Sequence, residues 1–243
     1  MCIIALAIAA HPGWPLVVAA NRDELHARAS VPLAAWAASA IIAGRDAVSG
    51  GTWLGVSAAG RFAAVSNVRH DGATLADRSS RGALVVDFLR ERAVPDAGAG
   101  RRFNPFNLIV IEGAVAQFHS NHPNTHRPVG AGIHAFSNGA LDDAWPKTVR
   151  LKRALARRLA GPGFRPADLF VDLRDEEATA TLRPVEDAIF VRDAVYGTRC
   201  STVMAVGADG AGEIVERRFD AAAQMVGETR LRFDWPVRDT RTG

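Results

Sequence analysis

The sequence predicts an α+β protein in which helices pack over antiparallel β-sheets. Short apolar runs recur along the chain between Gly, Pro and Asn turn signals, which is the pattern of successive β-hairpins. Segments with apolar residues at helical spacing interrupt this series. The chain has 243 residues, 48% hydrophobic and 23% charged, which suits one globular domain over 1–243 with a sizeable core.

The first hairpin is formed by two apolar runs, 3–10 and 15–20, around a His-Pro-Gly-Trp turn. Pro presets φ and Gly tolerates positive φ, so this turn sequence reverses the chain. If the turn is symmetric about its Pro-Gly pair, Cys2 lies opposite Asp23, and a bulge slips that register by one. Either register places Cys2 beside the charged sequence 21–24.

Later segments continue the alternation of strands and helices. Further strands are expected at 40–43, 53–57, 61–66, 107–111, 115–119, 133–137, 189–192, 200–206 and 214–219. Helices are expected at 81–92, with Ser80 as its N-cap, at 145–159 and at 166–173. Loops are expected at 95–102 and, as an acidic connector, at 175–182. The basic residues of 145–159 are expected on the solvent side, and the pattern leaves open whether there are one or two sheets.

Charge and cysteine content exclude several classes of protein. The net charge is only +3 and the basic residues are dispersed, so nucleic acid is not expected as a partner. The two cysteines, Cys2 and Cys200, make no disulfide framework, which indicates a reducing, cytoplasmic location. The apolar run 3–20 has no basic residue before it and is broken by Pro-Gly, so neither a signal peptide nor a transmembrane segment is expected.

Cys2 is the first candidate catalytic residue. Removal of the initiator Met would give Cys2 a free α-amine, which titrates near neutral pH and can serve as a base for the thiol. A neighbouring Arg22 lowers a thiol pKa, and Asp23 is placed to orient the amine. The alternative is that Cys2 is a small buried apolar residue beside a polar strand end.

Further candidates follow other predicted strands. Asn67 and Asn138 come directly after strands, and Asn side chains can donate to the oxyanion that forms in acyl transfer. Arg199 can bind a substrate carboxylate or hold the site electrostatically. The alternative is that both Asn residues only form turns and that Arg199 makes a surface ion pair.

The sequence also contains a histidine cluster, His119, His122 and His126. Imidazoles at such spacing can bind a metal. No acidic or thiol partner is close in the sequence, and the segment has the composition of a surface loop. No metal site is therefore expected.

Several motifs together identify a family. They are Met1-Cys2, Asn21-Arg22-Asp23-Glu24, Gly50-Gly51-Thr52-Trp53-Leu54-Gly55-Val56, Ser66-Asn67-Val68-Arg69, Ser137-Asn138-Gly139 and Tyr196-Gly197-Thr198-Arg199. In this order they resemble the NRDE family, which includes the transport and Golgi organisation protein 2 group. The chain is also similar to the cysteine branch of the N-terminal nucleophile hydrolases, such as penicillin V acylase and bile salt hydrolase. The resemblance implies a four-layer αββα sandwich of two antiparallel sheets.

The resemblance also assigns roles by position. It implies Cys2 as nucleophile, Arg22 and Asp23 beside its thiol and amine, Asn67 and Asn138 as oxyanion-binding and amine-orienting residues, and Arg199 as a C-terminal site arginine.

Two functions follow from the resemblance. The first is an amidohydrolase without a cofactor, which cleaves a linear non-peptide C–N bond of a small-molecule amide through a Cys2 acyl-enzyme. The second is a non-catalytic protein that handles haem or lipid and acyl-CoA, with Cys2 or the His119 cluster as axial ligands. A tight cleft in which Cys2, Asp23 and both Asn residues meet favours the enzyme, and a broad apolar groove favours the carrier.

Overall fold

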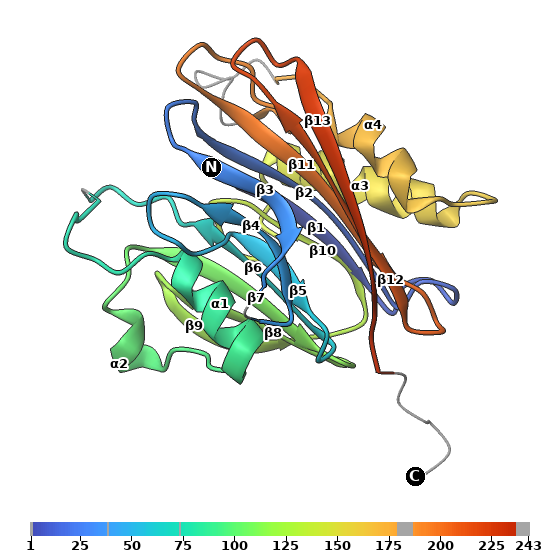
Figure 1. The fold of residues 1–243 in the computed structure, drawn as a ribbon, viewed down its shortest axis with the longest axis horizontal. Helices are drawn as coiled ribbons and strands as arrows, with labels where there is room; N and C mark the ends of the chain where they lie inside the picture. The colour runs from blue at the N-terminus through green and yellow to red at the C-terminus, as the bar shows by residue number, and fades with distance from the viewer. Residues whose placement is uncertain (1, 38, 73, 179–186, 237–243) are drawn as a thin grey trace.

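The computed structural model describes residues 2–37, 39–72, 74–178 and 187–236. Within these ranges, two antiparallel sheets pack face to face and helices cover both outer faces (Figure 1). The four-layer αββα arrangement implied by the resemblance is confirmed, and the strands form two sheets rather than one. In this part of the chain, no helix has both the length and the hydropathy needed to cross a lipid bilayer.

Neighbouring strands in both sheets are antiparallel. The first sheet has the order β10 (Gly132–Phe136), β1 (Cys2–Ile8), β2 (Leu16–Leu25), β11 (Tyr196–Val206), β12 (Ala211–Phe219) and β13 (Met225–Asp234). The second has the order β3 (Ser30–Ala35), β4 (Ile41–Asp46), β5 (Leu54–Ser57), β6 (Arg61–Asn67), β7 (Phe106–Glu112), β8 (Val115–Asn121) and β9 (Asn124–Val129).

The predicted helices form the outer layers. α3 (Pro146–Ala160) and α4 (Leu169–Leu173), with the short 3₁₀ turn η1 (Pro166–Asp168) before α4, pack on the first sheet. α1 (Gly82–Glu91) packs on the second. The three predicted helices are confirmed, whereas the predicted loop at 95–102 contains a further short helix, α2 (Ala97–Gly100). Each main helix presents an apolar stripe to its sheet, such as Leu151 and Leu155 of α3.

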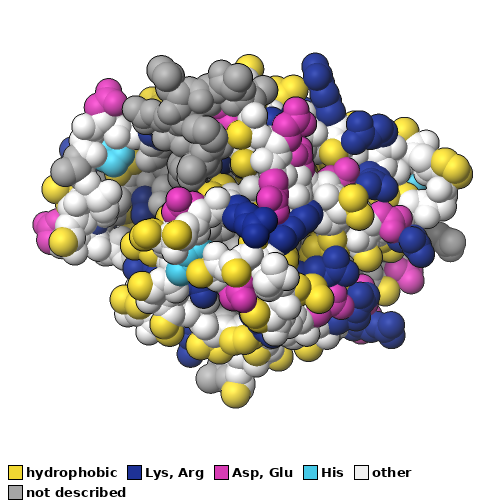
Figure 2. All heavy atoms as spheres, turned by 90° about the horizontal axis from the view of Figure 1, so that it is seen from above, with side chains coloured by type: hydrophobic (Ala, Val, Ile, Leu, Met, Phe, Trp, Pro, Cys, Tyr) yellow, Lys and Arg dark blue, Asp and Glu magenta, His cyan; other side chains and the backbone are white. Residues whose placement is uncertain are grey.

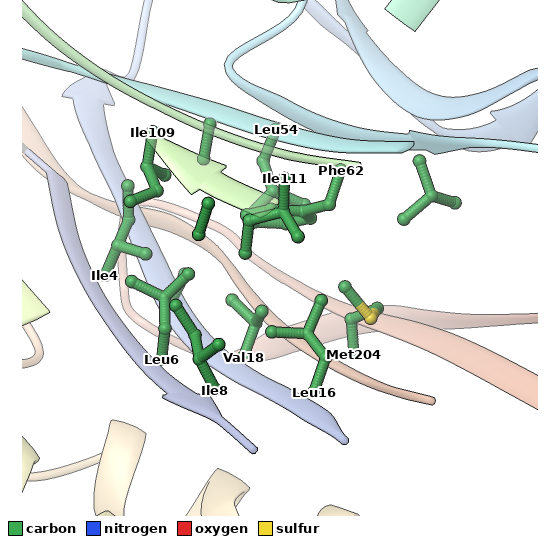
Figure 3. Close-up of a cluster of buried hydrophobic side chains, with 14 of the residues drawn as sticks. Ile4, Leu6, Ile8, Leu16, Val18, Leu54, Phe62, Ile109, Ile111 and Met204 are labelled. Carbon is green, nitrogen blue, oxygen red and sulfur yellow. The ribbon is translucent and has the colours of Figure 1, made fainter. Parts of the chain in front are cut away.

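The central core lies between the two sheets. Ile4, Leu6 and Val18 of the first sheet point toward Phe62, Ile109 and other side chains of the second (Figure 3). Because β1 and β2 are covered by the second sheet on one face and by α3 and α4 on the other, almost every residue in them is buried. This double cover explains why their sequences read as continuous apolar runs rather than as alternation.

The register of β1 against β2 differs from the symmetric expectation by one residue. Cys2 pairs with Arg22, not with Asp23, and Ile8 pairs with Leu16. The extra residue is taken up in the turn, where Ala9 has a φ of 45° and donates its N–H to the Pro15 carbonyl. Since cross-strand partners share a face of the sheet, Arg22 lies on the same face as Cys2.

Three strands were not predicted, and all are edge strands. β3, β9 and β13 are largely exposed. β3 and β9 also contain Pro32 and Pro128. Edge strands tolerate Pro and polar residues because one side of their backbone has no strand partner, so their sequences lack a strong strand pattern.

The predicted strand at 189–192 is wrong. Ile189 and Val191 are buried, but they lie in an irregular segment. Side chains satisfy its backbone: Asn21 Nδ2 donates to the Ile189 carbonyl, and the Val191 N–H donates to Thr198 Oγ1. An apolar run without a strand partner gives the same sequence signal as a buried strand. The acidic connector predicted at 175–182 extends beyond the described residues.

Candidate active site

A cavity of about 700 Å³ opens beside the first residue of β1. Its described lining includes Cys2, Arg22, Asp23, Asn67 and Arg199. One wall comes from the first sheet, and the other from the second sheet and the segment that leads into α1. On the end of the molecule seen in Figure 2, Lys and Arg side chains gather with carboxylates across the central part of the face. Five of the six predicted site residues therefore line one cavity.

Cys2 lies at the floor of this cavity with only 9% of its surface exposed. Ser137 Oγ donates to its carbonyl oxygen at 2.6 Å, which ties the start of β1 to the end of β10. Burial raises the pKa of the Cys2 thiol above its ordinary value, and the charge of Arg22 lowers it in part. A thiol in this setting needs a base before it can attack a carbonyl.

The two terminal guanidinium nitrogens of Arg22 differ in whether they have a partner. Its Nη2 lies 3.4 Å from Asp46 Oδ2 and 3.6 Å from Glu24 Oε2. Its Nη1 is buried and has no hydrogen-bond partner among the described residues, although the side chain is only 10% exposed. Buried guanidinium donors are nearly always paired in folded proteins. Arg22 is therefore held by carboxylates at Nη2, and its Nη1 is available to a ligand.

Asp23 contacts the Cys2 thiol through its backbone N–H, whereas its carboxylate lies on the other face of the strand. Because side chains alternate along β2, it leaves the sheet on the face opposite Arg22, toward α3. Thr198 Oγ1 donates to Asp23 Oδ1 at 2.7 Å. Burial raises the pKa of the Asp23 carboxyl, and the charge of Lys147 and the bond from Thr198 oppose that rise.

Lys147 corrects an expectation about α3. The basic residues of this helix were expected to face solvent, but Lys147 is fully buried and interacts electrostatically with Asp23. It occupies the first turn of α3, which contains no acidic residue. A cation there opposes the helix macrodipole. A lysine in the first turn of a helix is therefore the sequence signal that would have singled out Lys147.

The two predicted Asn residues have different positions. Asn67 is exposed and lines the Cys2 cavity. Asn138 is buried and lines a second cavity of about 530 Å³. Asn138 Nδ2 donates to the Asn67 carbonyl at 2.8 Å, and Asn138 Oδ1 accepts from Ser137 Oγ at 3.0 Å. Asn67 thus shares a cavity with the candidate nucleophile, and Asn138 holds the backbone of Asn67.

Arg199 braces the turn between β2 and β3. It sits where the register of β11 shifts between Thr198 and Cys200. Its Nη1 donates to the carbonyl oxygens of Leu25, His26 and Arg28 at 3.1, 2.7 and 3.4 Å. Three backbone acceptors on one nitrogen favour a positioning role for Arg199 at the rim of the cavity. The alternative of a surface ion pair has no counterpart in the described residues.

A second cysteine flanks Arg22. Cys200 of β11 pairs with Arg22 from the side opposite Cys2 and also lines the cavity. Both cysteines are free thiols. Two strand spacings separate their backbones by about 10 Å, which is beyond the reach of a disulfide. Burial, with the charge of Glu216, raises the pKa of Cys200 well above its ordinary value, so this thiol is expected to be unreactive.

Arg81 is a further lining residue that sequence reasoning assigned only to a helix. It immediately precedes α1, and its Nη1 donates to the Pro105 carbonyl at 3.1 Å. Among the described residues, no carboxylate lies within ion-pair distance of it. Burial lowers its pKa, whereas the negative charges of Cys2 and Glu24 raise it, so Arg81 interacts electrostatically with the candidate nucleophile.

The histidine cluster does not assemble. His119 and His126 pair across β8 and β9 with ring centroids 4.1 Å apart, while His122 packs against His70 in the second cavity. Burial lowers the pKa of His119 to about 4. In the described ranges, no three His, Cys, Asp or Glu side chains are grouped as metal ligands. The expected surface loop is largely the edge strand β9.

Comparison with known proteins agrees with this geometry. A family model described as Transport and Golgi organisation 2 matches residues 1–221. The chain belongs to that family. A Bos taurus transport and Golgi organization protein 2 homolog is 29% identical over 280 residues, covering 99% of this chain and 99% of its own length. The Homo sapiens homolog is 29% identical over 256 residues, covering 89% of this chain and 92% of its own length.

The fold of the chain is similar to that of a solved acid amidase structure. The structure of a Caenorhabditis elegans N-acylethanolamine-hydrolyzing acid amidase ortholog matches with a TM-score of 0.52 at 15% identity. The match covers 84% of this chain and 92% of that one. At this identity the likeness concerns the fold alone.

Proposed function

We propose that this member of the transport and Golgi organisation 2 family is an N-terminal cysteine amidohydrolase that cleaves linear non-peptide amide bonds. The observation that carries the proposal is the position of Cys2. It begins β1 on the floor of a charged cavity, with Arg22 as its direct cross-strand partner and Asn67 on the wall. Thioester chemistry needs a thiol, a nearby base and oxyanion donors in one enclosed place.

In the first half-reaction, Cys2 forms an acyl-enzyme. Removal of Met1 leaves a Cys2 α-amine, which takes the thiol proton. The sulfur attacks the amide carbon, and the new oxyanion accepts hydrogen bonds from the Asn67 side-chain amide. The C–N bond then breaks, the α-ammonium returns its proton to the leaving amine, and a thioester remains on Cys2.

In the second half-reaction, water replaces the amine. The neutral α-amine removes a proton from water, and the resulting hydroxide adds to the thioester carbon. Loss of the thiolate releases a carboxylic acid, and the proton returns to sulfur. Asp23, held by Thr198 beneath this amine and charge-balanced by Lys147, stabilises the α-ammonium in both half-reactions.

The proposal is tested with a panel of N-acyl amides and three variants. Wild-type protein purified with processed Cys2 should release amine and acid from at least one member. Cys2→Ala and Cys2→Ser should lose this activity, by about 10³-fold or more, because no strong nucleophile replaces the thiol. Cys200→Ala is the matched cysteine control and should keep it. Equal turnover by wild type and Cys2→Ala would refute the proposal.

The alternative, a carrier of haem or of lipid and acyl-CoA, has less support from the site. The cavity is lined by seven arginines and four carboxylates together with apolar side chains such as Trp53 and Phe219, so it is not a broad apolar groove. For haem, no described histidine lines it, and burial keeps the Cys2 thiol protonated rather than as the thiolate that binds iron. The residues present therefore do not fit haem at this site.

The proposal also places the enzyme in the cytoplasm. A nucleophilic thiol at the first residue must stay reduced to react, and a reducing compartment provides that condition. The two cysteines of the chain are both free and form no disulfide with each other.

A further inference from the structure

The charge of the Cys2 cavity points to the class of substrate. Seven arginines and four carboxylate side chains are among the described residues that line it. Cavities with an excess of one sign raise the local concentration of ligands of the opposite sign. The question is which of these cations are already satisfied by the protein.

Five of the seven arginines are either exposed to solvent or paired within the protein. Arg45 and Arg78 are exposed. Arg28 Nε lies 2.6 Å from Asp46 Oδ2, and Arg199 donates to three backbone carbonyls. Arg218 lies 3.8 Å from Glu216 and donates to Thr229 Oγ1. These three side chains have protein partners, although Arg199 Nε is itself buried without a hydrogen-bond partner among the described residues.

Arg22 and Arg81 are the exceptions. Arg22 is more than nine-tenths buried and lines the cavity, yet its Nη1 has no partner among the described residues. Arg81 has a backbone carbonyl as acceptor but no carboxylate within ion-pair distance in the same ranges. Both line the same cavity as Cys2, and Arg22 is its direct cross-strand partner, so a group that they hold lies in the cavity of the candidate nucleophile.

The position of Arg81 has a local cost that an anion would relieve. It stands at the N-terminus of α1, a ten-residue helix with no acidic residue in its first turn. The positive end of the helix dipole repels a guanidinium there, while a bound anion is attracted by both. Ser49 and Ser80 also line the cavity, and their hydroxyls lie 3.1 Å apart. Arginines, hydroxyls and a helix N-terminus are the usual partners of carboxylate and phosphate.

We propose that Arg22 and Arg81 bind an anionic group of the substrate, so that the enzyme acts on N-acyl amines that carry a carboxylate or a phosphate. This inference rests on the proposed amidohydrolase function and adds the substrate class. The acyl chain or the leaving amine then occupies the rest of the cavity while the acid group fixes the scissile bond over Cys2.

Binding is measured by calorimetry with the non-hydrolysing Cys2→Ala protein and two matched pairs of compounds. One pair is N-octanoylglycine and its neutral amide, N-octanoylglycinamide. The other is N-octanoyl-phosphoethanolamine and neutral N-octanoylethanolamine. Each acid should bind about tenfold or more tightly than its neutral partner, as expected for a charge-assisted arginine contact. The pair with the larger ratio identifies carboxylate or phosphate as the natural anion.

Two further variants test whether the preference for the acids over the neutral compounds depends on Arg81. In Arg81→Gln the ratio of acid to neutral affinity should fall to about threefold or less, with the neutral compounds unchanged. Arg90→Gln removes the same charge from the exposed opposite end of α1 and should leave the ratio intact. Should Arg81→Gln fail to fold, the ratio in the Arg81-containing protein must still fall with added salt. Equal affinities within both pairs, or a ratio that survives Arg81→Gln, would overturn the inference.

Measuring whether wild-type protein cleaves the same four compounds distinguishes failure of the anion site from failure of the amidohydrolase proposal. If the acids bind preferentially and wild-type protein cleaves none of the compounds, the anion site stands and the amidohydrolase proposal fails. If wild type cleaves acid and neutral members alike and no binding preference exists, the amidohydrolase stands and the anion site fails.

Discussion

Cys2 and Arg22 are direct cross-strand partners in the first two strands of the chain. Their Cβ atoms are therefore about 5 Å apart on the same face of the sheet, the face that borders the cavity. Asp23, the next residue, leaves the opposite face toward Lys147 and Thr198. The register of this hairpin thus places the Arg22 side chain on the face of the Cys2 side chain and the Asp23 carboxylate on the other face.

The first prediction concerns the Cys2 thiol. Arg22→Gln should raise its pKa, because the variant removes a positive charge that now favours the thiolate. A shift of one unit would slow alkylation by iodoacetamide about tenfold at fixed pH below the pKa. The measurement is the alkylation rate as a function of pH for wild type, Arg22→Gln and Arg22→Lys. An unchanged profile in Arg22→Gln would show that Arg22 does not act on the sulfur.

The second prediction concerns the buried pair on the other face. Lys147→Met keeps the volume of the side chain but leaves Asp23 without the cation that offsets its burial. Removing one member of a buried charge pair costs about 3 kcal/mol or more of unfolding free energy. Adding Asp23→Asn to Lys147→Met should recover a large part of this loss. Denaturant unfolding of both single variants and the double variant measures the coupling, and strictly additive losses would exclude it.

The third prediction is a pH dependence at His119. Its pKa is about 4 in the folded chain, below the ordinary value of 6.5, because burial disfavours the charged ring. The unfolded chain takes up this proton first, so stability is full above about pH 6.5 and is lost as the pH falls toward 4. His119→Phe should reduce the fall in unfolding free energy over that interval by about 2 kcal/mol.

The control for that experiment is His122→Gln, a change at an exposed histidine three residues along the chain. Unfolding free energies of wild type and both variants are compared at several pH values between 7 and 4. If wild type and His119→Phe lose stability in parallel, burial of His119 is not the cause.

The fourth prediction tests whether Arg199 stabilises the β2–β3 turn or binds the substrate. Arg199→Met should lower the unfolding free energy by about 2 kcal/mol, because three carbonyl oxygens of the β2–β3 turn lose their shared donor. The acid-to-neutral affinity ratio of the ligand pairs should stay near that of wild type. A stable variant with a lost ratio would instead assign Arg199 to the substrate.

The sequence predicted the inner strands and main helices because each carries a strong local pattern. β1, β2 and β6 are continuous apolar runs, and α1 and α3 have apolar stripes. The edge strands β3, β9 and β13 were not predicted, because exposed strands do not need apolar residues and so lack that pattern. The apolar run at 189–192 was wrongly predicted as a strand, because a buried irregular segment and a buried strand have the same apolar sequence pattern.

The candidate site was predictable only in part. Motif resemblance found Cys2, Arg22 and Asn67, which line the cavity. The hairpin register depended on one extra turn residue that composition does not reveal. Arg81 and Lys147 come from distant helices, and each opposes the dipole of its own helix. Such local conflicts mark functional positions, and they are the signal to look for in similar sequences.

The most direct test of the catalytic proposal is intact mass spectrometry of the protein, quenched in acid during turnover of a cleaved N-acyl amide. The proposal predicts a chain that begins at Cys2 and carries the mass of one acyl group, with the adduct mapped to the Cys2 peptide and absent from Cys2→Ala. A chain that retains Met1 and cleaves the amide without any adduct on Cys2 would contradict it.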